Sequence, residues 1–161
     1  MQKLINQTQV LENEWTLVTD LESELPNGKI IVPGAYFLEN KAALLERGDV
    51  AVVLEAGADL EDYAADLGNL PVVAVDFPAF TDGRGYSLAR LLKERYDYQG
   101  EIRAMGDVLI DQLHFMKRCG FDTYLLKEGL DGEKALNYFA TFADPYQLAY
   151  DEKEPLFRRK A

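Results

Sequence analysis

Short apolar runs alternate with segments of helical periodicity along most of the chain. Runs rich in β-branched residues, typical of strands buried in a parallel sheet, occupy residues 30–33, 50–54 and 72–75. Apolar residues at helical spacing alternate with the strands, at residues 39–47, 88–96 and 109–118, and the last of these segments follows a further strand expected at 101–105. Such alternation predicts parallel pairing through right-handed crossovers. We therefore expect a single compact α/β domain over residues 1–161, with a mainly parallel sheet that is either open or part of a barrel.

The pattern is clearest between residues 72 and 120, where it predicts two consecutive strand–turn–helix units. Pro78 ends the first strand because it has no N–H for a sheet ladder, and Ser87 is the expected N-cap of the helix that follows. Asp107 is the expected N-cap of the second helix, and Gly120 is its expected end. Both turns then lie at the carboxyl edge of a parallel sheet, where open α/β folds and barrels bind ligands.

The two ends of the chain depart from this alternation. Residues 8–11 and 15–18 flank a polar turn and predict a β-hairpin, so residues 1–20 form a hairpin extension at one side of the sheet. The last helix is expected to begin at Asp131 and to end before Pro145. The charged tail over residues 152–161 is expected to fray.

Charge and hydropathy limit the classes of partner that this chain is expected to bind. The 161 residues include 17 Lys and Arg against 28 Asp and Glu, so the formal net charge is −11. This argues against nucleic acid and anionic membranes as partners. No apolar run is long enough to span a bilayer, and the N-terminus lacks a signal-peptide core. A cytoplasmic protein is the simplest expectation.

The first candidate site is the glycine-rich segment Asp82-Gly83-Arg84-Gly85-Tyr86-Ser87, which precedes an expected helix N-terminus. Glycines let backbone amides approach a ligand, and the first N–H groups of a helix bind anions. Arg84 adds a bidentate grip on an oxyanion such as sulfite, sulfate or phosphate. The competing interpretation is a tight turn in which Asp82 and Arg84 pair with neighbouring loops.

A second group of polar residues belongs to the same edge. Asp107 has a structural role as an N-cap, and Gln112 lies farther along the same expected helix. Arg103 is expected to pair with Asp76 on the adjacent strand or with Asp107. These residues form either a buried ion-pair network or a proton-handling site, in which Asp76, Asp82 and Asp107 are the candidates for catalytic work.

Histidine and cysteine chemistry is sparse. His114 is the only histidine, and a packed or solvated residue is the simpler interpretation. Cys119 is the only cysteine, so an internal disulfide is excluded and a small buried residue is expected. No metal-ligand spacing and no nicotinamide or flavin fingerprint occurs. We therefore predict no metal site and leave any cofactor open.

Several motifs resemble those of a bacterial family of unknown function. The motifs are FPAFTDGRGYS at 77–87, ARLL at 89–92, GEIRAMGDVL at 100–109, DQL at 111–113 and RCGFD at 118–122. Members of that family are typically encoded beside sulfite reductase and are often labelled oxidoreductases of sulfite reduction. The resemblance covers roughly residues 45–150. It implies a role in assimilatory sulfur metabolism and transfers neither a mechanism nor a catalytic residue.

Three functional hypotheses follow. Iron–sulfur clusters are usually held by several cysteines, so an accessory role is easier to defend than sulfite reduction by this chain alone. The leading hypothesis is a protein that binds sulfite reductase or its electron donor through residues 82–87 and 107–112. The alternative is a small enzyme or binding protein for an oxyanion or phosphorylated ligand, with Arg84 and Arg103 as anion contacts. In the third, the polar motif only builds the fold. The oligomeric state stays open.

Overall fold

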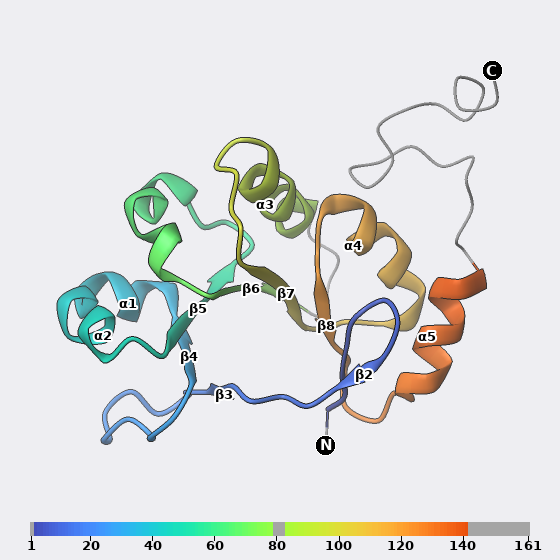
Figure 1. Ribbon diagram of the computed structural model, residues 1–161, viewed down its shortest axis with the longest axis horizontal. Helices are drawn as coiled ribbons and strands as arrows, with labels where there is room; N and C mark the ends of the chain where they lie inside the picture. The colour runs from blue at the N-terminus through green and yellow to red at the C-terminus, as the bar shows by residue number, and fades with distance from the viewer. Residues whose placement is uncertain (1, 79–82, 142–161) are drawn as a thin grey trace.

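Eight strands form one sheet in the computed structural model, which describes residues 2–78 and 83–141 (Figure 1). In spatial order these strands are β2 (Val10–Leu11), β1 (Leu4–Ile5), β8 (Thr123–Leu125), β7 (Glu101–Gly106), β6 (Val72–Phe77), β5 (Val50–Glu55), β4 (Ile30–Pro33) and β3 (Thr16–Leu17). Strands β3 to β8 pair in parallel, and β1 pairs antiparallel with both β8 and β2. The sheet curls into a half-barrel, so the predicted α/β class is confirmed, with a partial barrel rather than an open sheet.

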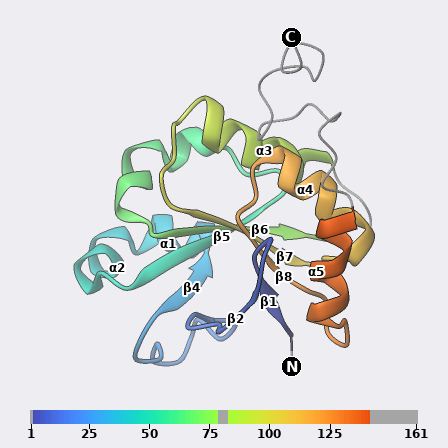
Figure 2. The ribbon, with the colours of Figure 1, turned by 45° about the vertical axis from the view of Figure 1, so that its right-hand side comes forward.

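Helices cover the outer, convex face of this half-barrel (Figures 1 and 2). They are α1 (Gly34–Glu39), α2 (Lys41–Arg47), α3 (Gly83–Glu94), α4 (Leu113–Cys119) and α5 (Gly132–Thr141), with the 3₁₀ segments η1 (Leu60–Asp62), η2 (Ala64–Asn69) and η3 (Ile110–Gln112). The N-terminal connection from β2 to β3 crosses the opposite, open side. Within the described residues, no helix combines the length and apolar character needed to cross a membrane.

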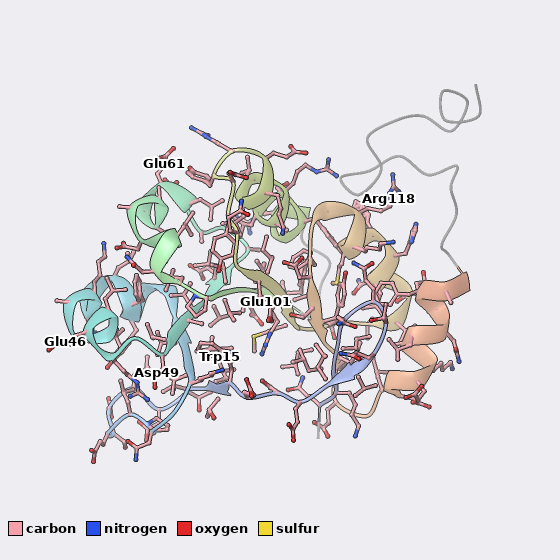
Figure 3. The ribbon with its side chains drawn as sticks, in the orientation of Figure 1. Trp15, Glu46, Asp49, Glu61, Glu101 and Arg118 are labelled. Carbon is pink, nitrogen blue, oxygen red and sulfur yellow. The ribbon has the colours of Figure 1, made fainter. Side chains whose placement is uncertain are left out.

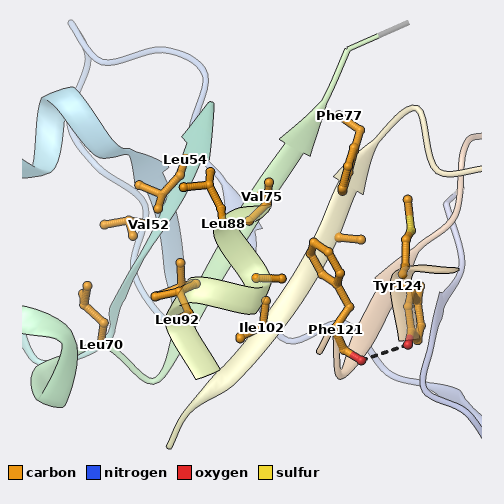
Figure 4. Packing of buried hydrophobic residues seen from close by; sticks show 14 of the residues in the cluster. Val52, Leu54, Leu70, Val75, Phe77, Leu88, Leu92, Ile102, Phe121 and Tyr124 are labelled. Atoms are coloured by element: carbon orange, nitrogen blue, oxygen red, sulfur yellow. Dashed lines mark hydrogen bonds between the residues drawn. The ribbon is translucent and has the colours of Figure 1, made fainter. Parts of the chain in front are cut away.

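The strands bury side chains on both faces, which explains their nearly continuous apolar runs. On β6, Val73 and Val75 face the helices, whereas Val72 and Ala74 belong to a second cluster on the inner face. Figure 4 shows the helix-facing layer, in which Leu88 of α3 packs with these strands. Each fully buried aliphatic side chain of this kind contributes about 1.5–3 kcal/mol relative to exposure. The two clusters together fix the curvature that positions the strand ends.

The connection between β2 and β3 covers the inner face at the amino ends of the strands. Trp15 packs against the inner cluster, and Asn13 accepts a hydrogen bond from Arg103 Nη1 at 3.1 Å. In Figure 3, Trp15 and Glu101 lie near the middle of the molecule, whereas Glu46 lies at its periphery. These contacts of Trp15 and Asn13 hold the connection extended across the open side of the half-barrel.

This extended connection corrects the predicted hairpin strands. An N-terminal antiparallel pair is present, but it joins β1 with β2. The expected pairing of residues 8–11 with residues 15–18 is wrong, because β2 and β3 lie at opposite edges of the sheet. The contacts of Asn13 and Trp15 hold the intervening residues away from a turn.

The starts of two central helices also differ from the prediction. Helix α3 begins at Gly83, so Ser87 is an internal residue whose hydroxyl donates to the Gly83 carbonyl at 3.3 Å rather than an N-cap. The second helix begins only at Ile110, so Asp107 is not its N-cap. Val108 is fully buried, so the chain first turns back against the core before the helix begins. Gly120 ends α4 in a left-handed conformation, as expected.

Candidate functional site: a cavity at the carboxyl edge of the half-barrel

A cavity of about 920 Å³ opens where the parallel strands end. Its lining comes from the carboxyl ends of β3 to β8, together with the segments that follow β3, β4 and β5. Parallel half-barrels direct the side chains and loops that follow each strand toward this edge, which is where barrel enzymes bind their ligands. We call this cavity the edge cavity.

The wall on the inner face of the sheet is a row of neighbouring strand residues. In register, Glu55 of β5 pairs with Asp76 of β6, and Asp76 pairs with Met105 of β7. All three line the edge cavity, with Val53 of β5 and Leu125 of β8. The row places two acidic residues side by side next to an apolar surface.

Asp76 is the predicted site residue that this cavity contains. Its Oδ1 lies against Gly106, where an added Cβ would come within 2.6 Å of it. Partial burial raises the pKa of the Asp76 carboxyl above its ordinary value, although the side chain keeps part of its surface in water. Within residues 2–78 and 83–141, no hydrogen bond or ion pair reaches this carboxylate.

The far wall carries further acidic groups around a buried tyrosine. Asp59 and Asp62, both exposed, are the N-cap and the last residue of η1, and the Asp59 side chain accepts a hydrogen bond from the Glu61 N–H at 3.0 Å. Burial raises the pKa of Tyr63, and the negative charges of Asp62 and Glu55 raise it further. The tyrosine hydroxyl lies directly over Gly34, at a position that a β-carbon would occupy. The cavity wall is therefore both tightly packed and negatively charged.

Arg84 reaches the rim of the edge cavity from the first turn of α3. A Cβ added to Gly57, a lining residue, would lie 2.9 Å from Arg84 Nη1. One guanidinium thus lies beside Gly57 at the rim of a cavity with four acidic lining residues, and none of the described lining residues is itself Lys or Arg.

Gly85 and Tyr86 of the glycine-rich segment pack against neighbouring rings rather than lining the cavity. Gly85 is buried, and the Phe77 ring occupies the space that a side chain would need there, at 2.7 Å from an added Cβ. Tyr86 contacts the Phe77 ring, with centroids 5.0 Å apart, and meets Phe115 of α4 edge-on at 4.7 Å. Gly83 has open space around it. Asp82 lies outside the described residues.

The other predicted site residues are dispersed. Arg103 does not pair with Asp76 or Asp107; its Nη2 lies 2.8 Å from Glu101 Oε2 at the amino end of the inner face. Asp107 forms an ion pair with Lys127 Nζ at 3.0 Å. The Gln112 side chain accepts a hydrogen bond from the Leu109 N–H at 3.4 Å. The expected network of Asp76, Arg103 and Asp107 is therefore wrong, because these residues point to different ends and loops.

Cys119 is buried as expected, and burial raises the pKa of its thiol. Among the described side chains, no group of three or more His, Cys, Asp and Glu has the arrangement of a metal site.

Sequence reasoning missed most of the residues that line the edge cavity. They come from strand ends distant in the sequence: Val18, Thr19, Gly34, Glu55, Asp62 and Tyr63. Their shared signal is that each lies at or after the carboxyl end of an apolar run, or next to a polar turn. Since parallel strands end together, this position would have marked them as candidates for the same edge.

Fold and site together define a class of protein: an α/β half-barrel with an acidic, ligand-sized cavity at its carboxyl edge. The chain belongs to the family described as "Bacterial protein of unknown function (DUF934)", whose model matches residues 51–157. No curated protein matches the chain. The family match begins in β5, so β3 and β4, which supply part of the cavity wall, lie before it.

Proposed function

We propose that this protein is a cytoplasmic accessory component of assimilatory sulfite reduction that docks onto sulfite reductase or its electron donor through the carboxyl edge of the half-barrel. The resemblance to a family encoded beside sulfite reductase supports the pathway. The observation that supports the docking edge is the set of exposed carboxylates around the edge cavity: Glu55, Asp59, Asp62 and Asp76.

Electrostatics favour a basic surface as the docking partner. The formal net charge of −11 attracts a positive patch over distances of about 8 Å at physiological ionic strength. Charge pairing of this kind speeds association and makes it sensitive to salt. An accessory role also suits a chain with one cysteine, because it leaves the iron–sulfur chemistry to the reductase.

The experiment measures the affinity between this protein and purified sulfite reductase by isothermal titration at low and high salt. The edge variant combines Glu55→Gln with Asp62→Asn, two exposed positions at the cavity. The matched control combines Glu46→Gln with Glu94→Gln, which removes the same charge at the ends of α2 and α3. We expect about tenfold weaker binding for the edge variant, about 1.4 kcal/mol, and little change for the control.

Two outcomes would reject this proposal. The first is the absence of association at low salt, together with a reductase activity that does not change when this protein is added. The second is equal weakening by the edge variant and the control, which would mean that overall charge, rather than the carboxyl edge, determines binding.

A second candidate function is the binding of an oxyanion or phosphorylated ligand. The position of the Arg84 guanidinium beside Gly57, at the rim of the edge cavity, favours it. Sulfite, sulfate or phosphate would then raise the melting temperature of the wild type, and Arg84→Ala would abolish this effect while Arg90→Ala, on the same helix, would retain it. Unchanged stabilisation in the Arg84 variant would reject the assignment.

A further inference from the structure

The edge cavity has the dimensions of a small-molecule site. Its volume of about 920 Å³ lies within the range of about 300–1,000 Å³ that is usual for ligand pockets. Much of its wall is apolar, with Leu17, Val53, Met105 and Leu125 among the lining residues. A concave, largely apolar surface with a few polar groups is the usual composition of a site for an organic ligand.

The polar groups in the wall are placed for a positive charge. Asp76 stands in the inner row between Glu55 and Met105, and no partner neutralises its carboxylate within the described part of the chain. A bound cation would supply the hydrogen-bond donors that the Asp76 carboxylate lacks within the described residues, and its charge would balance the neighbouring Asp76 and Glu55 carboxylates.

We propose that the edge cavity binds a small organic cation, an amine or guanidine carried on an apolar body. The Asp76 carboxylate accepts the hydrogen bonds of the cationic head, and the side chains of Val53, Met105 and Leu125 cover the body. This assignment goes beyond docking to a protein partner, because it gives the cavity a ligand of its own.

The alternatives fit the wall less well. An inorganic anion placed beside Asp76 would meet the negative charges of Glu55 and Asp62, and only Arg84 at the rim would oppose them. A neutral apolar molecule would bury the Asp76 carboxylate without a partner, which is costly for a charged group. A cation with an apolar body is the ligand class that satisfies both parts of the wall.

Two methionine methyl groups provide a direct readout with an internal control. Met105 lines the edge cavity, whereas Met116 is fully buried in the helix-facing core. The full-length protein labelled at the methionine methyls is titrated with n-butylammonium or n-butylguanidinium at constant ionic strength. We expect a saturable shift of the Met105 resonance in the millimolar range and no shift of Met116.

Matched probes and variants separate the parts of the inference. Neutral n-butanol should give at least tenfold weaker binding, and sodium sulfate should leave Met105 unchanged. Asp76→Asn removes the charge at a position without a described partner, so the fold is expected to persist while cation binding is lost. Glu46→Gln on α2 should bind the cations as the wild type does.

Several results would overturn the inference. One is a Met105 resonance that shifts with neither cation, and another is a Met105 resonance that shifts with sulfate alone. Butanol binding as tight as that of butylammonium, or undiminished cation binding in Asp76→Asn, would overturn the inference as well. Because the probes contain no reductase, these outcomes are independent of the docking proposal.

Discussion

The polar residues at the two ends of the inner face of the half-barrel differ in their bonding partners. At the amino end, Arg103 is 2% exposed and fully engaged: it bonds to Glu101 and to Asn13, and Thr123 Oγ1 donates to the same Glu101 carboxylate at 2.7 Å. At the carboxyl end, Asp76 borders a cavity, and no partner occurs within the described residues.

This difference separates polar groups that are paired within the fold from a carboxylate that faces a cavity. Buried polar groups that are paired stabilise one arrangement of the chain, and removing one partner is costly. A carboxylate at an open cavity contributes little to the fold and stays accessible to a ligand. The residue type alone does not distinguish these roles, because Arg103 and Asp76 were both candidate site residues in the sequence, the first as an anion contact and the second for proton transfer.

The largest effect is expected for Arg103→Ala. The substitution leaves Glu101 partly buried without its cation and releases Asn13 of the β2–β3 connection. Breaking a buried pair in this way costs about 3 kcal/mol of unfolding free energy, measured by urea denaturation. Arg90→Ala, a half-exposed position on α3, serves as the control and should change stability by less than about 0.5 kcal/mol. Similar losses for both variants would contradict a structural role for the amino end.

Gly106→Ala should have the next largest effect. Gly106 has a φ of 87°, and an added Cβ would contact the Phe77 carbonyl oxygen and Asp76 Oδ1. We expect a loss of about 2 kcal/mol, from the strained backbone together with the clash. Gly129→Ala isolates the cost of the strained backbone, because Gly129 has a similar φ of 92° and no atom lies within 4 Å of a Cβ added there. Equal losses at the two glycines would show that the edge cavity tolerates the added methyl group.

The smallest effect is expected for Asp76→Asn, which should leave stability within about 0.5 kcal/mol of the wild type and slightly higher at neutral pH. The pKa of Asp76 is raised on folding by partial burial, so the folded state holds this proton more tightly than the unfolded state. Its contribution to stability therefore falls as the pH rises from the ordinary pKa of 3.8 through the raised folded value. The variant should lose this part of the pH dependence in thermal melts, and a lower melting temperature at pH 7 would contradict it.

The sequence predicted the repeated strands and the edge at which they end, because apolar runs and glycine stops are local signals. It placed Ser87 and Asp107 at helix starts wrongly, since tertiary packing decided both positions. Gly85 leaves room for the Phe77 ring within α3, and buried Val108 delays the second helix. A local pattern of caps and glycines carries no information on such contacts.

The structure separates the residues of the predicted site. Asp76 lies in the cavity and Arg84 at its rim, whereas Arg103, Asp107 and Gln112 have partners elsewhere. The missing lining residues come from the N-terminal strands and from η1. Glu55 lies beside Asp76 on the neighbouring strand, whereas the residues that follow β3 and β4 reach the same cavity because the sheet is curved, and curvature depends on packing across the whole chain.

Amide hydrogen–deuterium exchange, with and without sulfite reductase at low salt, tests docking through the carboxyl edge. We expect slower exchange at this edge, in residues 55–63 and 17–19, and unchanged exchange at the amino edge in residues 96–101. Protection confined to the amino edge, or no protection anywhere at saturating reductase, would contradict the claim that the carboxyl edge is the recognition surface.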